Sequence, residues 1–276
     1  SNCEAASRAV AVGPNDVLLS FLPLSHSFER LAGYYLPALI AGAQIYYSSG
    51  IERLLTDIEE VKPTIITGVP RLLERIYASI LKRSEEQSIF SRTLLEFALS
   101  ISPLLNRLTE GRNQGLARTL TRANNIWLKR ALAPVRRMLG SRLRFVVSGG
   151  AHLSKQTAEF FYSAGVLVLE GYGLTEAAPI VSVNRPSAFR FGTVGRPLDN
   201  VRLRLTQENE IMVKGPNVML GYVGGNHDAG AWIDEEEWLH TGDLGRIDKD
   251  GYLILTGRKK ALFKDSAGRY VSPSKI

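Results

Sequence analysis

The chain has 276 residues, 45% of them hydrophobic and 22% charged, and a formal net charge of +7. This composition is that of a globular protein and excludes a disordered chain. A single cysteine, Cys3, excludes an internal disulfide framework and a multi-cysteine metal cluster. The N-terminus has no basic-then-apolar signal pattern, so we expect a cytoplasmic location. Pro37 and Gln44 interrupt the longest apolar stretch, 31–47, which favours a buried helix followed by a strand over a membrane span.

The first third of the chain alternates strand-like and helix-like segments. Short apolar runs predict buried strands, and we expect them at 17–22, 45–47, 64–67, 142–148 and 166–170. A helical stretch at 51–61 separates two of these runs. Strands that alternate with helices predict a parallel sheet covered on both faces, an α/β fold. From about residue 70 to 141 the sequence is helical in period and rich in Leu and Arg.

The pattern changes after residue 192. Apolar and charged side chains alternate at 201–205 and 210–214 between glycines and prolines, which predicts half-exposed antiparallel strands. Residues 248–251 fit a hairpin turn. We therefore divide the chain into an α/β portion at 1–191, which contains a helical, basic insert at 70–141, a small β-rich, barrel-like subdomain at 192–257, and a terminal segment at 258–276.

The most specific chemistry lies in residues 170–176, with the sequence EGYGLTE. Glycines allow tight turns after a predicted strand, and Tyr172, Thr175 and Glu176 then supply an aromatic face, a hydroxyl and a carboxylate. Loops at the carboxyl ends of parallel strands form ligand crevices, where such groups stack on a base, bind phosphate and hold Mg²⁺. From this segment alone, a glycine-rich turn with an incidental acid remains the alternative.

Three other segments carry suitable groups. Residues 148–151 are small and follow a predicted strand, so a flat ligand can approach the backbone, although many such glycine pairs are only turns. Asp243, next to Gly242, suits bidentate binding of a ribose diol. Arg258 offers a fixed cation for ribose or phosphate oxygens.

Taken together, these motifs resemble those of the adenylate-forming enzymes, which include acyl-CoA synthetases, nonribosomal adenylation domains and luciferases. The resemblance rests on Tyr-Gly-Leu-Thr-Glu at 172–176, Thr-Gly-Asp at 241–243 and Gly-Arg-Lys-Lys at 257–260. Residues 22–30 (LPLSHSFER) and 68–74 (GVPRLLE), with the insert after Pro70, look specifically like long-chain fatty acid–CoA ligases. The resemblance covers essentially the whole chain and implies part of the large N-terminal domain of such an enzyme.

The resemblance also implies roles for matching positions. The positions that would bind the nucleotide are Gly149, Gly150, Ala151, Tyr172, Gly173, Thr175, Asp243 and Arg258. The positions that would border the acyl carboxylate are His26, Gly149 and Gly171. The catalytic positions would be Thr175 at the α-phosphate, Glu176 as the Mg²⁺ ligand and Lys260 at the hinge of a small C-terminal domain. For Lys260, a solvated charge at a strand end is the alternative.

The implied reaction is the ATP-dependent activation of a long-chain fatty acid to acyl-AMP, followed by transfer of the acyl group to CoA. ATP, Mg²⁺, CoA and the fatty acid are therefore the expected ligands. In-line attack at phosphorus requires positioning and charge neutralisation more than covalent help. Adenylation of another carboxylic acid is the alternative within the same superfamily.

The sequence departs from the family pattern at both ends. It contains no glycine-rich phosphate loop ending in lysine, and it ends before the position of the family's C-terminal catalytic lysine. Residues 258–276 look like the hinge and the start of a truncated C-terminal domain. We therefore interpret the chain as an internal piece that is inactive alone, with exposed apolar surfaces that favour self-association.

The positive charge is concentrated in the insert. Residues 107–144 contain ten basic residues and one acidic residue. The net charge of this segment, +9, exceeds the +7 of the whole chain. The insert is either a solvated helix face or a patch that contacts anionic lipid at the inner membrane surface. A nucleic-acid-binding module is a remote alternative. Because the basic residues lack interleaved aromatics and a recognition motif, we expect no nucleic-acid partner.

Overall fold

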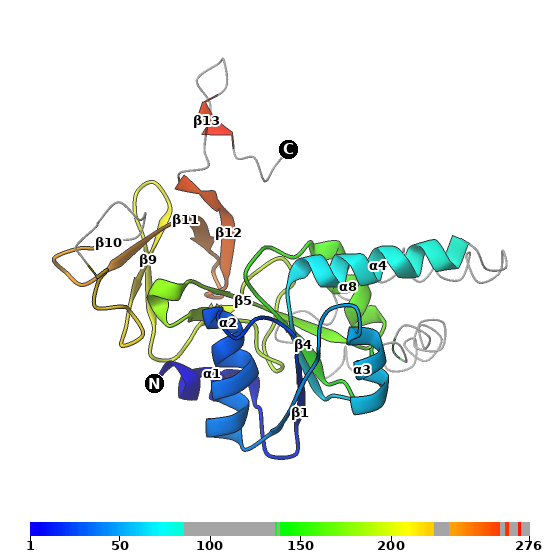
Figure 1. Cartoon of the computed structure of the whole chain (residues 1–276). Coiled ribbons are helices and arrows are strands. Elements are labelled where there is room, and N and C mark those ends of the chain that lie inside the picture. Colours follow the sequence, from blue (N-terminus) through cyan, green and yellow to red (C-terminus); the bar gives the residue numbers. More distant parts are fainter. Residues whose placement is uncertain (86–135, 137–138, 224–231, 260–262, 265–269, 272–276) are drawn as a thin grey trace.

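The computed structural model describes residues 1–85, 136, 139–223, 232–259, 263–264 and 270–271 (Figure 1). Most of the predicted helical insert, including most of its basic residues, lies outside these ranges, as does Lys260. Within the described part of the chain, no helix combines the length and apolar character that crossing a membrane requires.

A seven-stranded sheet organises the first two thirds of the chain, in the order β2-β1-β3-β4-β5-β6-β7 (Figure 1). Its parallel strands are β1 (Val17–Ser20), β2 (Gln44–Tyr47), β3 (Ile65–Gly68), β4 (Phe145–Ser148) and β5 (Leu167–Gly173). Two antiparallel strands complete the sheet: β6 (Ile180–Val183) and β7 (Arg196–Pro197). The predicted strands and their parallel arrangement are confirmed.

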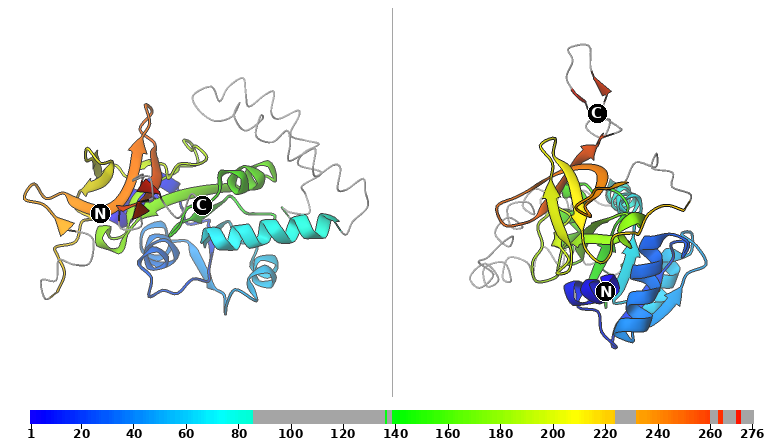
Figure 2. Two further views of the ribbon diagram at one scale, coloured as in Figure 1. Left: turned by 90° about the horizontal axis from the view of Figure 1, so that it is seen from above. Right: turned by 90° about the vertical axis from the view of Figure 1, so that its left-hand side faces the viewer.

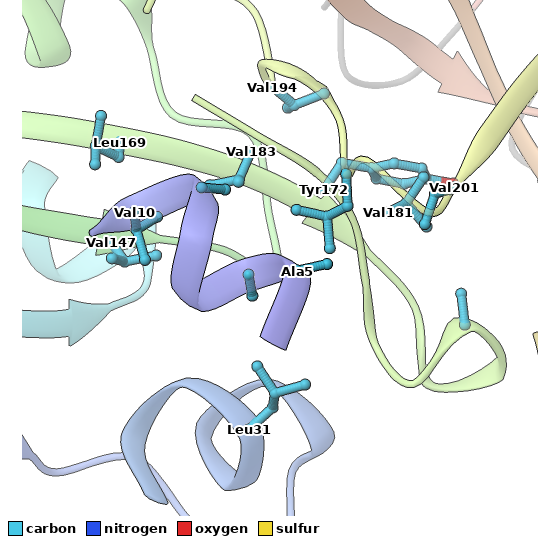
Figure 3. Close-up of a cluster of buried hydrophobic side chains, with 14 of the residues drawn as sticks. Ala5, Val10, Leu31, Val147, Leu169, Tyr172, Val181, Val183, Val194 and Val201 are labelled. Carbon is cyan, nitrogen blue, oxygen red and sulfur yellow. The ribbon is translucent and has the colours of Figure 1, made fainter. Parts of the chain in front are cut away.

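Helices cover both faces of this sheet, as predicted. One face packs against α1 (Asn2–Val10) and η1 (Arg30–Ala41). Figure 3 shows part of this core, with Val10 of α1 beside Val147 of β4. The other face packs against α3 (Leu54–Val61), α4 (Pro70–Glu85) and α8 (Lys155–Ser163). Because successive strand residues point to opposite faces, Val147 belongs to the first core and Val146 to the second.

Local sequence signals explain where these helices begin and end. The side chain of Ser154 accepts a hydrogen bond from the backbone N–H of Thr157 at 3.1 Å and caps α8. The same helix ends before Gly165, whose φ of 83° is easily adopted by glycine. Helix α3 ends at Lys62, directly before Pro63, which cannot continue a helix.

The prediction of a buried helix within 31–47 is only partly correct. Helix η1 and strand β2 form, but Tyr34, Tyr35 and Ile40 on η1 are exposed, and Leu39 is 68% exposed. The strand that follows is also open to solvent. The physical reason is that β2 is the edge strand of the sheet, so no described element covers its outer side.

A second sheet of five antiparallel strands follows and corresponds to the predicted β-rich part. Its strands are β8 (Arg202–Leu205), β9 (Glu210–Lys214), β10 (Trp232–Ile233), β11 (Leu239–Ile247) and β12 (Leu253–Arg258). The hairpin predicted at 248–251 joins β11 to β12. This sheet lies on one side of the first sheet, and α4 and α8 lie on the other (Figures 1 and 2). Two short paired strands follow, β13 (Phe263–Lys264) and β14 (Tyr270–Val271).

Strand β9 differs from the predicted half-exposed pattern, because Glu210 to Val213 are all buried. The strand lies between β8 and β11 in the centre of the second sheet. The buried Glu210 carboxylate accepts a hydrogen bond from the backbone N–H of Gly242 at 3.0 Å. It also lies 3.5 Å from His240 Nδ1 and 3.4 Å from Lys259 Nζ. Polar partners therefore allow a charged residue of an alternating pattern to be buried.

The two sheets are joined near the predicted boundary at residue 192. Strand β7 follows that residue yet pairs with β6 of the first sheet. Leu253 on β12 accepts a hydrogen bond from the backbone N–H of Val194 at 2.9 Å and donates one to the carbonyl of Gly195 at 2.8 Å. A Cβ atom at Gly195 would lie 2.0 Å from the carbonyl carbon of Val183. The crossing therefore requires glycine at this position.

We predict that Gly195→Ala destabilises the protein more than Gly251→Ala. Both glycines have a positive φ, 78° and 82°, which costs an alanine about 1 kcal/mol. A Cβ at Gly251 meets open space, whereas a Cβ at Gly195 requires the backbone of Val183 to move. Urea unfolding of both variants measures the difference. Equal losses of stability would show that the close approach between the sheets is not a constraint.

Candidate functional site

A cavity of about 450 Å³ lies at the carboxyl ends of the parallel strands. Its walls come from the segments that follow β1, β3 and β4, from the end of β5 and the turn after it, and from β6. Of the predicted site residues, the cavity brings together His26, Gly149, Gly150, Gly171, Tyr172, Gly173 and Thr175. The remaining described ones, Ala151, Glu176, Asp243 and Arg258, lie outside its lining. The clustering follows from the topology, because parallel strands end at the same edge of a sheet.

One side of the cavity is formed by the helical turn α2 (Ser27–Glu29), which sequence reasoning did not single out. Ser27 Oγ lies 3.3 Å from Thr175 Oγ1. The ring of Phe28 packs so closely over Gly149 that a Cβ there would be 3.0 Å from the ring. Turn α2 therefore contacts the loops after both β4 and β5. The motif at 22–30 contains Ser27 and Phe28, but the resemblance implied a site role for His26 alone.

A buried carboxyl group anchors this turn to the sheet. The Glu29 side chain is fully buried, and its Oε1 accepts hydrogen bonds from Ser20 Oγ at 2.5 Å and Thr67 Oγ1 at 3.0 Å. Burial raises the pKa of Glu29, which favours the neutral acid. A side chain at Gly33 would lie 2.4 Å from Oε1. Glu29 thus connects strands β1 and β3 to the helix that follows it.

Asp243 on β11 links the second sheet to the cavity. Its Oδ2 accepts a hydrogen bond from the Tyr172 hydroxyl at 2.7 Å, and its Oδ1 accepts one from Arg258 Nε at 2.7 Å. The backbone N–H of Asp243 donates to Thr241 Oγ1 at 3.1 Å. Burial and the nearby carboxylate raise the pKa of Tyr172, which keeps its hydroxyl a donor. Tyr172 therefore lines the cavity and binds Asp243 through its hydroxyl.

Glu176 lies in the turn η2 (Thr175–Ala177), directly after the cavity-lining Thr175. Its Oε1 accepts a hydrogen bond from the hydroxyl of Tyr222 at 2.8 Å. Among the described residues, no group of three or more His, Cys, Asp or Glu side chains could hold a metal ion. A single carboxylate still fits Mg²⁺, which proteins often bind through one or two carboxylates together with substrate phosphates.

A second buried carboxyl group lies on the opposite face of the sheet from Glu29. Glu170 in the middle of β5 is 3% exposed, and its Oε2 accepts a hydrogen bond from the backbone N–H of Leu153 at 3.2 Å. The same oxygen lies 3.8 Å from His152 Nδ1. Burial raises the pKa of Glu170 to about 7. Glu170 thereby attaches the loop that contains Gly149 and Gly150 to the neighbouring strand.

Comparisons with known proteins agree with this geometry. Residues 1–223 match the model of the AMP-binding enzyme family. The chain belongs to this family. It is 33% identical to human long-chain-fatty-acid–CoA ligase 1 over 293 residues, which cover all of this chain and 40% of the ligase. It is 34% identical over 276 residues to long-chain-fatty-acid–CoA ligase 5 of Rattus norvegicus, covering 95% of this chain and 38% of that protein.

Solved structures show the same AMP-binding fold. ATP-bound MatB from Rhodopseudomonas palustris superposes with a TM-score of 0.70 at 25% identity, over 99% of this chain and 46% of that one. The α/β fold with a parallel sheet and a smaller antiparallel sheet is therefore confirmed as that of adenylate-forming enzymes. The chain spans about two fifths of the length of the human and rat ligases that it matches.

We predict that Glu170→Gln makes the protein's stability less dependent on pH. Because the folded pKa lies near 7, above the usual value for Glu, the unfolded chain ionises first as the pH rises. As the pH rises from the unfolded to the folded pKa of Glu170, the free energy of unfolding of the wild type should fall by roughly 3 kcal/mol relative to that of the glutamine variant. Urea unfolding of both proteins between pH 5 and pH 8 measures this. A pH-independent difference between them would contradict the raised pKa.

Proposed function

We propose that this chain forms the adenylate-binding pocket of an AMP-forming ligase that joins a long-chain fatty acid to CoA. The observation that carries the proposal is the cavity, whose wall combines Gly149 and Gly150 after β4 with Tyr172 near the end of β5 and Thr175 after it. Membership of the AMP-binding enzyme family supports a nucleotide as its occupant. The names of the human and rat relatives support the fatty acid and the thiol acceptor.

The nucleotide would bind along the ends of β4 and β5. Its adenine would lie against the backbone of Gly149 to Ala151 and the ring of Tyr172. Its ribose diol would bind Asp243, whose carboxylate is already oriented by Tyr172 and Arg258. The α-phosphate would bind the hydroxyl of Thr175. Ser27 supplies a second hydroxyl, whose Oγ lies 3.3 Å from Thr175 Oγ1. Glu176 would hold Mg²⁺, which neutralises phosphate charge when bound with ATP.

The fatty acid would occupy the apolar part of the same cavity. Its carboxylate would lie near His26, Gly149 and Gly171, and the apolar wall is formed by Leu22, Phe28, Val69, Val147, Leu174, Ile180 and Val183. A carboxylate oxygen attacks the α-phosphorus of ATP, and pyrophosphate leaves. The CoA thiol then attacks the acyl carbon, and AMP leaves. The protein's contribution is to align these groups and exclude water.

Three expectations from the sequence stay predictions. Lys260 as the hinge and the basic insert as a contact for anionic lipid both concern residues largely outside the described ranges. Self-association is supported by the exposed apolar side chains of η1 and β2, among them Tyr35, Leu39 and Tyr47, because large exposed apolar patches tend to be covered by other molecules.

We predict that the chain binds AMP and, more tightly, a non-hydrolysable palmitoyl-adenylate analogue. Tyr172→Ala and Asp243→Ala should each weaken analogue binding by about 10-fold or more, because each removes a contact in a buried, charge-assisted hydrogen-bond network. Isothermal titration calorimetry measures all four affinities.

Tyr252→Phe serves as the matched control, because Tyr252 lies directly before β12, against Arg190 and Arg196, and outside the cavity lining. A benzoyl-adenylate analogue tests which carboxylic acid the cavity accepts. If it binds as tightly as the palmitoyl-adenylate analogue or more tightly, adenylation of another carboxylic acid is favoured. A folded chain that binds neither AMP nor either analogue would contradict the proposed function.

A further inference from the structure

The segment 217–222 follows β9 of the second sheet and holds the turn η2 through three hydrogen bonds. The Asn217 side-chain amide donates to the carbonyl of Ala177 at 2.8 Å. The backbone N–H of Met219 donates to the carbonyl of Glu176, also at 2.8 Å. The Tyr222 hydroxyl donates to Glu176 Oε1 at 2.8 Å. Backbone and side chain of Glu176 are therefore both held by the same short segment.

The contact with Tyr222 restricts the Glu176 carboxylate to one orientation. A glutamate side chain loses rotamer entropy when it is fixed, and the hydrogen bond from Tyr222 restricts it before any ligand binds. The hydrogen bond takes Oε1 and leaves Oε2 as the oxygen that a cation can approach. The phenolic hydroxyl of Tyr222 is a hydrogen-bond donor to this carboxylate at neutral pH.

We propose that Tyr222 is a positioning residue that orients Glu176 toward the Mg²⁺ bound with the nucleotide. The inference rests on the proposed function, because it takes Glu176 as the metal ligand. Hydrogen-bond partners of ligating carboxylates orient them, and loss of such a partner typically lowers metal affinity or activity 10- to 100-fold. A residue 46 positions away in sequence, on a connection of the second sheet, thus controls the cation site of the first.

The experiment compares the affinity of the chain for ATP in Mg²⁺ with its affinity for ATP in EDTA, by calorimetry. The affinity in Mg²⁺ divided by the affinity in EDTA measures the contribution of the cation to ATP binding. In the wild type, ATP should bind more tightly with Mg²⁺. Glu176→Gln should bring the ratio close to one and, by removing a negative charge, strengthen binding of metal-free ATP. Tyr222→Phe should lower the ratio about 10-fold and leave binding of metal-free ATP unchanged.

Leu220→Ala is the matched control, because Leu220 lies in the same segment and its side chain is fully exposed. It should retain the wild-type ratio. A merely structural role for Tyr222 would weaken ATP binding equally with and without Mg²⁺. Electron paramagnetic resonance of Mn²⁺ with ATP reads the cation directly, and Tyr222→Phe should bind Mn²⁺ about 10-fold more weakly. Circular dichroism confirms that each variant is folded.

The outcomes separate this inference from the proposed function. If Glu176→Gln lowers the ratio and Tyr222→Phe keeps the wild-type ratio and Mn²⁺ affinity, the positioning role is wrong and the proposed function stands. If the wild type binds ATP equally well with and without Mg²⁺, Glu176 does not hold a cation and the inference falls. If the wild type binds neither AMP nor ATP, the proposed function and the inference fall together.

Discussion

The parallel alignment of β1, β3, β4 and β5 is the constraint on which the candidate site depends. Because these strands point the same way, the segments that follow them meet at one edge of the sheet. His26, Gly149 and Tyr172 are far apart in sequence and line one cavity for this reason. An antiparallel arrangement would have sent the loops after β3 and β4 to opposite edges, and no shared pocket would form from the same motifs.

Two buried carboxyl groups hold these segments in place, one on each face of the sheet. Glu29 connects turn α2 to β1 and β3, and Glu170 attaches the loop after β4 to β5. Burial disfavours their charged forms and raises the pKa of both. Hydrogen bonds from Ser20 and Thr67 to Glu29 Oε1, and from the backbone of Leu153 to Glu170, offset part of the cost of removing the carboxyl groups from water. Glu170 therefore supports the site from outside the cavity lining, whereas Glu29 belongs to the lining itself.

The sequence predicted most of the fold because hydrophobic period and turn residues are local signals. The parallel strands, the helix at 51–61 and the hairpin at 248–251 follow from such signals. Exposure of η1 and burial of Glu210 depend on whether a strand is at an edge or in the centre of a sheet, which no local pattern records. The motifs likewise indicated Tyr172 and Asp243, but their mutual hydrogen bond spans 71 positions and required the fold.

The second sheet contributes residues to the candidate site. Asp243 comes from β11 and contacts Tyr172, and Tyr222 comes from the connection after β9 and contacts Glu176. The cavity wall is built by the first sheet and the segments after its strands. The polar partners of Tyr172 in that wall and of Glu176 beside it belong to the second sheet and its connections. Under the proposed function, Gly195 at the crossing between the sheets would matter for binding as well as stability, because a shift there would move Asp243 and Tyr222 relative to the cavity. The two sheets therefore form one site, and neither carries the complete set of groups alone.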